Sequence, residues 1–396
     1  MQLSHRITTL LGDGGDGWGV FYRARAMKAA GRAVTELTIG EHDIRTDPRI
    51  LAAMHDAAMG GHTGYASIPG TAELRDAVAA RVKARTGVAT GRENVLITPG
   101  GQAGLFATHH ATCDTGDTAL YIDPAYVTYP GVLRALGLVP QAISTRAEDG
   151  FQPRADDLEA AVKATHRPRS LLVNSPNNPT GGVYARDTLE GIADVVREHD
   201  LWLISDEVYD TQVWDGAHLS PRALPDMPER TLVIGSMSKS HAMTGSRIGW
   251  IVGPADAISR MADLATHTTY GVPGFVQDAA CFALAQGAAL EAQVAAPFRR
   301  RRALALDLLA RQNLVPVQPP QGAMYLMLDI RTTGLSGESF AMALLDRHAI
   351  AVMPGESFGI AAAGHVRVAM TVADDLFVAA LGQLLDFAAE QAAMAA

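Results

Sequence analysis

The sequence predicts an α/β fold in which a large domain, with a mostly parallel central sheet sandwiched by helices, is joined to a smaller α+β domain. The chain has 396 residues, which is too long for one small core and fits two units of unequal size. Short apolar runs bounded by glycine and proline alternate with longer helical segments, as is typical of parallel sheets. After about residue 275 helical and strand-like segments alternate on a smaller scale, which indicates that a second unit begins there.

The first forty residues are expected to form an arm rather than a packed unit. Residues 12–19 are rich in glycine, and an amphipathic helix is expected over 20–30. The aromatic residues Trp18, Phe21 and Tyr22 lie in this arm. They either cover an active site or pack the arm against a partner subunit, and the sequence leaves both interpretations open.

Six short apolar runs are expected to form the central sheet, and a helix is expected over residues 71–86 ahead of them. Longer helical segments separate successive runs, so we expect most of the strands to pair in parallel. The runs are 94–98, 118–122, 170–174, 202–205, 231–235 and 249–252.

The C-terminal part is expected to begin with one long helix, because residues 279–312 are rich in alanine, arginine and leucine. It should continue with a strand at 323–329, a helix at 339–348, a strand at 365–370 and a final helix. We therefore assign residues 1–45 to the arm and part of the small domain, 46–280 to the large domain, and 281–396 to the C-terminal small domain.

Composition excludes several classes of protein. A net charge of −9 provides no basic surface for nucleic acid, and 48% hydrophobic with 19% charged residues is typical of a globular chain. No apolar run reaches the roughly 18 residues of a membrane span, and no secretory apolar segment is visible. Cys113 and Cys281 lie far apart without a CxxC pattern, so a cytoplasmic protein without a disulfide framework or metal site is expected.

Three segments place polar groups where predicted strands end. Segment 98–106 (TPGGQAGLF) joins a strand to a helix through two glycines, which suits an anion site at the helix N-terminus. Segment 174–182 (NSPNNPTGG) is rich in amides, and 204–209 (ISDEVY) places Asp206 at a strand end with Tyr209 three residues later. Ligands of open α/β sheets bind at such ends. Ordinary turns and a helix N-cap remain alternatives for each segment alone.

The most informative segment is 235–250 (GSMSKSHAMTGSRIGW). Lys239 lies among small hydroxyl residues directly after a predicted strand, and Arg247 follows eight residues later. The chain has only four lysines, and the other three are Lys28, Lys83 and Lys163. A lysine held in a site near other cations has a lowered pKa and acts as a nucleophile.

Together these segments resemble the class I and II aminotransferases of fold type I, which use pyridoxal phosphate (PLP). The motifs GGQ, PAY, NNPTG, SDEVY, SMSKS, a single arginine and VRV occur in the family's order and spacing. The resemblance runs from about residue 37 to the C-terminus. Because the matches are independent, agreement of the whole set by chance has a low probability.

The resemblance implies a position around PLP for each matching residue. Lys239 is expected to form a Schiff base with the cofactor and to move the proton at the substrate α-carbon. Asp206 is expected to pair with the pyridinium nitrogen, so that the ring acts as an electron sink. Tyr126 is expected to stack on the ring, and Tyr209 and Asn178 to bond its phenolic oxygen. The residues implied for the phosphate are Gly101, Gln102, Ala103, Ser236, Ser238, Arg247 and, from the other subunit of a homodimer with shared active sites, Tyr65.

The resemblance also implies how the amino acid and 2-oxo acid substrates bind. Arg367 is expected to clamp the α-carboxylate, with Gly40 and Asn178 beside it. Some members that use acidic substrates carry a lysine where this chain has Gln102. Others use an arginine from the partner subunit, in a segment where this chain has His267. These departures weaken the case for aspartate or glutamate as the donor.

Three functions fit this set of residues. Transamination is the expected one. A PLP-dependent lyase, for example one catalysing C–S β-elimination, would use the same residues, because the cofactor supplies the carbanion chemistry. A non-catalytic PLP-binding module is disfavoured, because the chain has no N-terminal DNA-binding domain and keeps Lys239.

Overall fold

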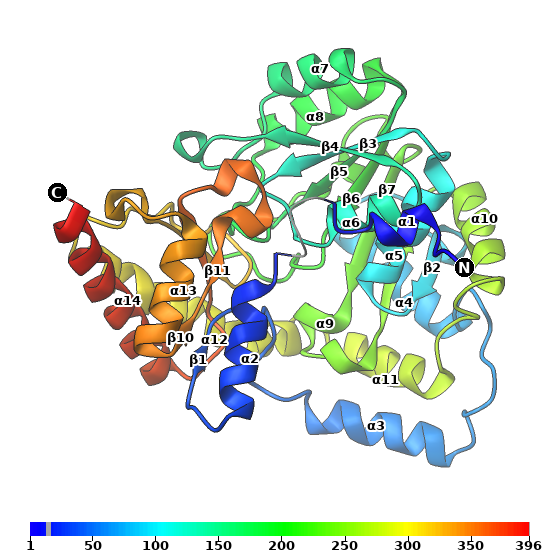
Figure 1. The fold of residues 1–396 in the computed structure, drawn as a ribbon. Coiled ribbons are helices and arrows are strands. Elements are labelled where there is room, and N and C mark those ends of the chain that lie inside the picture. The colour runs from blue at the N-terminus through cyan, green and yellow to red at the C-terminus, as the bar shows by residue number, and fades with distance from the viewer. Residues whose placement is uncertain (13–16, 396) are drawn as a thin grey trace.

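The computed structural model describes residues 1–12 and 17–395, and its centre is a seven-stranded sheet covered by helices (Figure 1). The strand order is β2-β8-β7-β6-β5-β3-β4, and β8 runs antiparallel to both of its neighbours while the other pairs are parallel. This confirms the predicted α/β class. The strands are β2 (Val95–Thr98), β3 (Thr118–Asp123), β4 (Val139–Ser144), β5 (Pro168–Asn174), β6 (Trp202–Asp206), β7 (Thr231–Ser236) and β8 (Gly249–Val252).

The central strands are apolar on both faces because helices cover both. Leu171 and Leu203 contribute to a cluster with helices α7 and α8, whereas the alternate residues Leu172 and Ile204 pack on the opposite side with Leu105 of α5. Buried strands of this kind read as continuous hydrophobic runs. The helices of this part are α3 (Pro48–Met59), α4 (Ala72–Thr86), α5 (Gly101–Thr112), α6 (Tyr129–Ala135), α7 (Ala155–Ala164), α8 (Arg186–Glu198), α9 (Met237–Ser240), α10 (Ala255–Thr266) and α11 (Gly274–Ala285).

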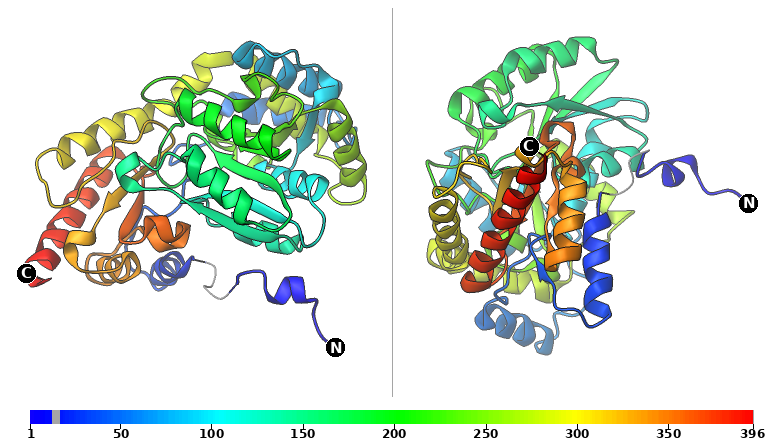
Figure 2. Two further views of the ribbon diagram at one scale, coloured as in Figure 1. Left: turned by 90° about the horizontal axis from the view of Figure 1, so that it is seen from above. Right: turned by 60° about the vertical axis from the view of Figure 1, so that its left-hand side comes forward.

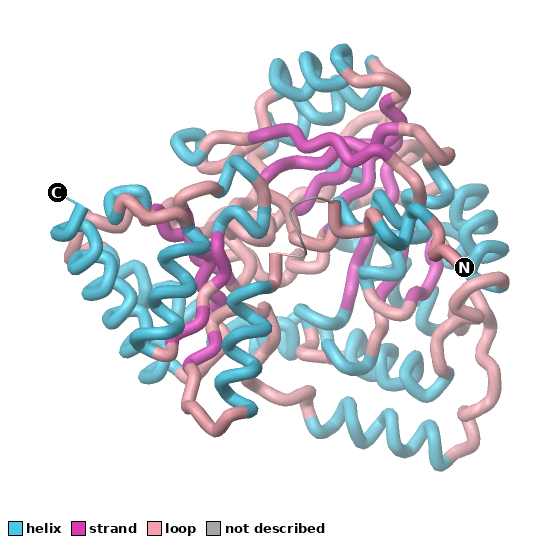
Figure 3. Tube along the Cα trace, viewed as in Figure 1, coloured by secondary structure: helices cyan, strands magenta, loops and turns pink. Residues whose placement is uncertain are grey.

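A second group of strands lies apart from the central sheet, as Figure 3 shows. It consists of the antiparallel sheet β11-β12-β9 and the parallel pair β1-β10, in which residues from the two ends of the chain meet. Its strands are β1 (Thr35–Glu36), β9 (Tyr325–Asp329), β10 (Ile350–Ala351), β11 (Met353–Pro354) and β12 (His365–Ala369).

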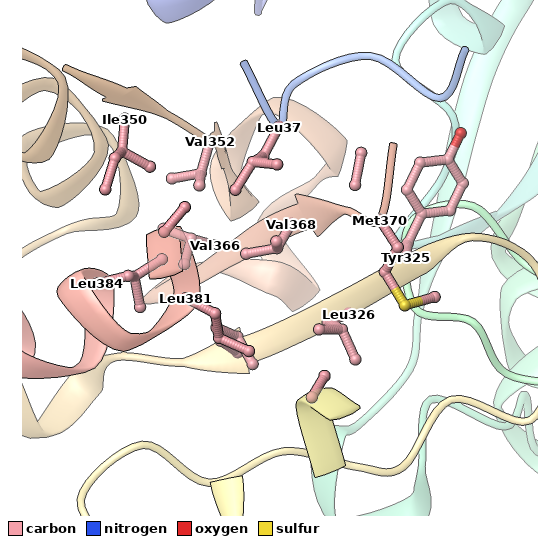
Figure 4. Close-up of a cluster of buried hydrophobic side chains, with 14 of the residues drawn as sticks. Leu37, Tyr325, Leu326, Ile350, Val352, Val366, Val368, Met370, Leu381 and Leu384 are labelled. Atoms are coloured by element: carbon pink, nitrogen blue, oxygen red, sulfur yellow. The ribbon is translucent and has the colours of Figure 1, made fainter. Parts of the chain in front are cut away.

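The core of this smaller unit joins the N-terminal and C-terminal segments. Leu37 packs with Val352, Val368 and Leu381 in one hydrophobic cluster (Figure 4). The four exposed residues of α1 lie at the margin of the molecule, away from this core (Figure 2). The remaining helices are α1 (His5–Thr8), α2 (Gly19–Ala29), α12 (Gly287–Leu309), α13 (Gly337–His348) and α14 (Asp374–Ala395).

The short strands β1, β10 and β11 were not predicted, and two larger elements also differ from the expectations. Strand β4 was not predicted, because it is an edge strand that leaves Val139 exposed and contains Pro140. The single helix expected over 279–312 is wrong. Two helices, α11 and α12, meet there at 92°, and Gly287 at their junction has a left-handed φ of 63°.

No single helix among the described residues is long and apolar enough to cross a membrane. Only α11 and α12 taken together reach that length and composition, and they are sharply bent against each other. Cys113 and Cys281 are both free thiols.

Candidate active site

A cavity of about 310 Å³ lies where strands β5, β6 and β7 end and helix α5 begins. The ends of parallel strands are the usual place for a ligand in an open α/β sheet. Residues of the arm, the central sheet and the small domain all face it. The lining residues are Trp18, Ile39, Gly40, Glu41, Gly101, Gln102, Leu105, Tyr126, Tyr129, Asn174, Asn178, Asp206, Val208, Tyr209, Ser236, Ser238, Lys239, Thr244, Arg247, Tyr325 and Arg367.

One end of the cavity is built to receive an anion. Helix α5 begins there at Gly101, so its first backbone N–H groups have no partner within the helix. Arg247 lies beside it in a left-handed conformation, with φ of 50°. A Cβ atom at Gly100 would lie 2.3 Å from the Arg247 guanidinium, so only glycine permits this approach. The hydroxyl of Ser236, which caps α9, lies at the same end.

Asp206 lines the same cavity from the last position of β6. Its Oδ2 accepts a hydrogen bond from the Tyr129 hydroxyl at 2.7 Å, and its Oδ1 accepts one from the Val208 N–H at 3.3 Å. The residue is buried, and burial raises the pKa of its carboxyl group to about 6. A buried acid of this kind favours a cationic partner.

Lys239 points into the cavity from α9, and its ammonium group donates a hydrogen bond to the Gly40 carbonyl. Burial is the main reason that its pKa is lowered to about 8, and the nearby cations Arg247 and Arg367 lower it further, whereas Glu41 opposes the shift. An amine that loses its proton near pH 8 is a usable nucleophile and base.

Arg367 is almost completely buried, with 1% of its surface exposed. Its Nη1 donates to Asn178 Oδ1 at 2.8 Å, and its Nη2 donates to the Thr38 carbonyl. The guanidinium lies between the rings of Tyr325 and Phe358, 4.4 and 4.5 Å from their centroids. Its Nε has no hydrogen-bond partner among the described residues, and burial lowers the pKa of the group. Such a cation suits a carboxylate ligand.

Tyr209 and Tyr325 form a hydroxyl pair at the wall between these groups. Their oxygens are 2.8 Å apart, and both side chains are buried. Gly40 passes directly beneath Tyr325, since a Cβ atom at this position would lie 1.8 Å from the tyrosine oxygen. Because Gly40 has no side chain, its backbone can lie directly against the Tyr325 hydroxyl.

The structure brings most of the predicted site residues into this one cavity. The exceptions are Ala103, which does not line it, and Tyr65, which lies on the surface with 90% exposure and packs edge-on against Tyr270. His267 caps the end of α10 and does not line the cavity either. Those brought together are Gly40, Gly101, Gln102, Tyr126, Asn178, Asp206, Tyr209, Ser236, Ser238, Lys239, Arg247 and Arg367.

Sequence reasoning missed several lining residues. Tyr129 and Tyr325 contact predicted site residues, but the sequence analysis assigned a role to neither. Thr38 contributes only its backbone carbonyl, which carries no sequence signal. For Tyr129 the available signal was its place in the same segment as Tyr126, since both tyrosines lie just after β3.

Comparison with known proteins shows which family the chain is similar to. Residues 32–381 match the sequence profile of the family described as aminotransferase class I and II. The chain is 40% identical over 373 residues to an arginine–pyruvate transaminase of Pseudomonas aeruginosa, covering 94% of each protein. It is 35% identical over 356 residues to an aspartate/prephenate aminotransferase of Thermus thermophilus, covering 89% of this chain and 90% of that one.

The fold comparison agrees with the sequence comparison. The solved structure of Thermus thermophilus aspartate aminotransferase with maleate superposes on the chain with a TM-score of 0.91 at 34% identity. The match covers 98% of this chain and 100% of that one.

Proposed function

The chain belongs to the class I and II aminotransferases, and from that premise we propose that it holds PLP in the cavity described above and transfers the amino group of arginine to pyruvate. Transamination is the activity of the named relatives, and none of those compared above is a lyase. The observation that carries the proposal is that the half-buried Lys239 and the buried Asp206 and Arg367 line one cavity.

The cavity offers a complementary partner for each functional group of PLP. A phosphate dianion fits the start of α5, where the backbone of Gly101, Gln102 and Ala103 lies near Arg247. The hydroxyls of Ser236 and Ser238 lie at the same end, at the cap and in the first turn of α9. The protonated ring nitrogen fits the buried Asp206 carboxylate, and the aldehyde fits the Lys239 amine. When bound, PLP supplies an electron-withdrawing ring that accepts charge from the α-carbon of the amino acid.

The remaining contacts orient the ring. Tyr126 presents an aromatic face to the cavity, and Tyr209 and Asn178 offer hydrogen bonds for the phenolic oxygen. Asp206 keeps the ring nitrogen protonated, because an ion pair in a buried site strongly favours the charged forms. Tyr129 holds that carboxylate in place through its hydroxyl.

The substrate side of the cavity belongs to Arg367 and Lys239. Arg367 binds the α-carboxylate of the donor in a bidentate pair, next to the Gly40 backbone and Asn178. Lys239 takes the proton from the α-carbon and returns it to the acceptor. Its lowered pKa leaves the amine unprotonated in a useful fraction of molecules near pH 8.

Charge in the cavity favours a basic donor over an acidic one. Among the described lining residues the cations are Lys239, Arg247 and Arg367, and each already has a partner in this scheme. Glu41 is a carboxylate at the same cavity that accepts one hydrogen bond, from Thr244 Oγ1 at 3.0 Å. A guanidinium side chain complements this carboxylate, whereas a second carboxylate on the donor would meet no free cation there. The similar transaminase from Pseudomonas aeruginosa is named for arginine and pyruvate.

A donor panel tests this proposal. Alanine formation from pyruvate is measured with arginine, aspartate, glutamate and alanine as donors, with Lys239→Ala as the inactive control. We expect kcat/KM for arginine to exceed that for aspartate by about a hundredfold or more, and Glu41→Gln to reduce this ratio. A preference for aspartate or glutamate contradicts the choice of donor. Release of pyruvate and ammonia from a cysteine conjugate without any oxo acid contradicts transamination.

We also propose that the enzyme is a cytoplasmic homodimer whose active sites borrow Tyr65 from the partner subunit. Tyr65 is 90% exposed and pairs with the half-exposed Tyr270, and tyrosine is enriched in protein interfaces. The two free thiols, Cys113 and Cys281, suit a reducing compartment.

A further inference from the structure

A short irregular segment, residues 38–43, lines the cavity with three of its residues and contacts both parts of the molecule; we refer to it as the strap. It forms neither helix nor strand, so its backbone groups depend on bonds to other elements. Each of its first four residues has such a bond. Their partners are Arg367 for the Thr38 carbonyl, Thr371 for the Ile39 carbonyl at 3.1 Å, Lys239 for the Gly40 carbonyl and Thr244 for the Glu41 side chain at 3.0 Å.

The far end of the strap is fixed by a buried arginine on helix α12. Arg301 has 3% of its surface exposed, and it grips Asp43 with two parallel bonds, Nη1 to Oδ1 at 2.9 Å and Nη2 to Oδ2 at 2.6 Å. Its Nε donates to Asp374 at the start of α14 at 2.9 Å, and its Nη1 also donates to the Met370 carbonyl at 3.0 Å.

The residue before Asp43 docks on the same helix. The ring of His42 lies edge-on against Phe298 of α12, with 5.1 Å between centroids. The end of the strap is therefore held on α12 by one aromatic contact and one bidentate ion pair, one helical turn apart. Of these two contacts, the ion pair is the directional one, because a planar guanidinium fixes both the distance and the plane of its carboxylate partner.

We propose that Arg301 is a positioning residue for the reaction, which acts through Asp43 to hold the strap carbonyls of Thr38 and Gly40 against Arg367 and Lys239. The inference rests on the proposed function of those two residues as carboxylate clamp and base. It does not place Arg301 in contact with any substrate.

The physical basis is the short distance along the strap. Only two residues separate Asp43 from Gly40, so a shift at Asp43 passes directly to the carbonyl that Lys239 contacts. A displacement of about 1 Å at a group that positions the substrate is enough to lower kcat/KM by up to about a hundredfold. Without the ion pair between Arg301 and Asp43, the strap keeps its other hydrogen bonds, but this ion pair no longer fixes its C-terminal end to α12.

The two acids on Arg301 provide a matched pair of variants. Asp43→Asn and Asp374→Asn each remove one acidic partner of the Arg301 guanidinium, and the two side chains are similarly exposed, at 23% and 27%. Asp374 also pairs with Arg300 of α12, so Asp374→Asn breaks more ion pairs than Asp43→Asn and is the stricter control for loss of structure. Both variants weaken the same buried group, so both should lower thermal stability. Only Asp43 belongs to the strap. An effect of Asp43→Asn that Asp374→Asn lacks therefore reports positioning rather than general loss of structure.

We expect Asp43→Asn to raise the KM for the amino donor about tenfold or more, with a smaller change in kcat, because the clamp formed by Arg367 is loosened. Asp374→Asn should leave KM close to the wild-type value. Equal KM values in the two variants, whether raised or not, overturn the proposal. If Asp43→Asn does not fold, Arg301→Lys replaces it, since lysine keeps the charge but loses the two-pronged contact.

A second measurement separates this inference from the proposed function. Hydrogen exchange of the backbone amides in residues 38–43 is followed in the cofactor-free wild type and in both variants. We expect faster exchange in Asp43→Asn and wild-type exchange in Asp374→Asn. If the wild type transfers no amino group, the proposed function fails, yet the exchange data still decide whether Arg301 fixes the strap. Unchanged exchange in Asp43→Asn overturns it.

Discussion

Burial of the ionised Asp206 carboxylate destabilises the cofactor-free protein. Its pKa is raised by burial from the ordinary 3.8 to about 6, so the folded protein holds this proton more tightly than the unfolded chain does. The free energy of unfolding therefore falls as the pH rises between these two values. Above pH 6 the ionised carboxylate destabilises the cofactor-free protein by up to about 3 kcal/mol, which a cationic ring nitrogen offsets.

Removing the charge of Asp206 should therefore increase the stability of the cofactor-free protein and decrease the activity of the enzyme. Asp206→Asn should raise the melting temperature of the cofactor-free protein at pH 8 and lower kcat about a hundredfold or more. Asp200→Asn, at an exposed acid just before β6, should change neither. Calorimetry and steady-state rates measure the two quantities. A rate within about tenfold of wild type would remove Asp206 from the proposed position beside the ring nitrogen.

Lys239 gives a pH dependence of the opposite sign. Burial lowers its pKa from 10.5 to about 8, so between these values the unfolded chain binds more protons than the folded protein. The free energy of unfolding of the cofactor-free protein should therefore rise with pH across this window.

The amine of Lys239 should also react as its pKa predicts. In the cofactor-free protein, labelling by an amine reagent and peptide mapping should show an inflection near pH 8 at Lys239. At Lys163, which is exposed and paired with Glu159, the pKa is raised and the inflection should come at higher pH. Identical profiles for the two lysines would contradict a buried, deprotonated Lys239.

The sequence predicted the site residues that belong to recognisable motifs. It did not predict the residues whose importance follows only from their contacts in the folded protein. Lys239 and Arg367 stood in recognisable segments, and both line the cavity. Tyr325 was missed because its partner Tyr209 lies 116 residues away. Arg301 lies in the stretch expected to be helical because it is rich in alanine, arginine and leucine, and that pattern does not show that Arg301 is buried between two acids.

Helices α11 and α12 show how one residue redirects an element. Both segments have the composition of a helix, and only the left-handed φ of 63° at Gly287 separates them. Glycine adopts this conformation at no steric cost, whereas other residues lose roughly 1–2 kcal/mol. The bend directs α12 from the large unit toward the small one, where Arg301 meets Asp43.

A pair of glycine substitutions tests this explanation. Gly287→Ala should lower the free energy of unfolding by about 1–2 kcal/mol, because alanine is strained at this φ even though open space surrounds the position. Gly382→Ala, in the interior of α14 and also in open space, should raise it by about 0.5–1 kcal/mol. Chemical denaturation measures both. A stabilising effect at Gly287 would contradict the role given to its conformation.

The strands were more predictable than the helix boundaries. Runs that are buried on both faces, such as β5 and β7, were found within two residues of their ends because helices on each side require apolar residues throughout. Strand β4 was not predicted because half of its residues face solvent. The break between α11 and α12 at Gly287 was not predicted because one glycine in a helical pattern is often tolerated.

For the whole molecule the main open prediction is the shared active site. Tyr65 lies outside the cavity of its own chain, packed on Tyr270 at an exposed edge. If a partner subunit covers this edge, Tyr65 can reach the anion end of the neighbouring cavity.

Complementation between two inactive variants tests this arrangement. Lys239→Ala subunits keep Tyr65, and Tyr65→Ala subunits keep Lys239, so a mixed dimer contains one complete site. Random re-pairing makes half of the dimers mixed, and we expect about a quarter of wild-type activity from an equal mixture of the two chains. Activity no higher than the mean of the two parents, or a monomer in light scattering at micromolar concentration, would leave each site to a single chain.

The pairing of β1 with β10 also has a consequence during biosynthesis. Thr35 pairs with Ile350, so 314 residues separate two partners in one small sheet. At the usual rate of translation the arm leaves the ribosome roughly 15 to 60 s before its partner strand exists. During that interval Leu37 has none of its later neighbours from the C-terminal part. Residues 35–37 thus emerge long before the strand that they pair with, which makes this segment a natural binding target for chaperones on the nascent chain.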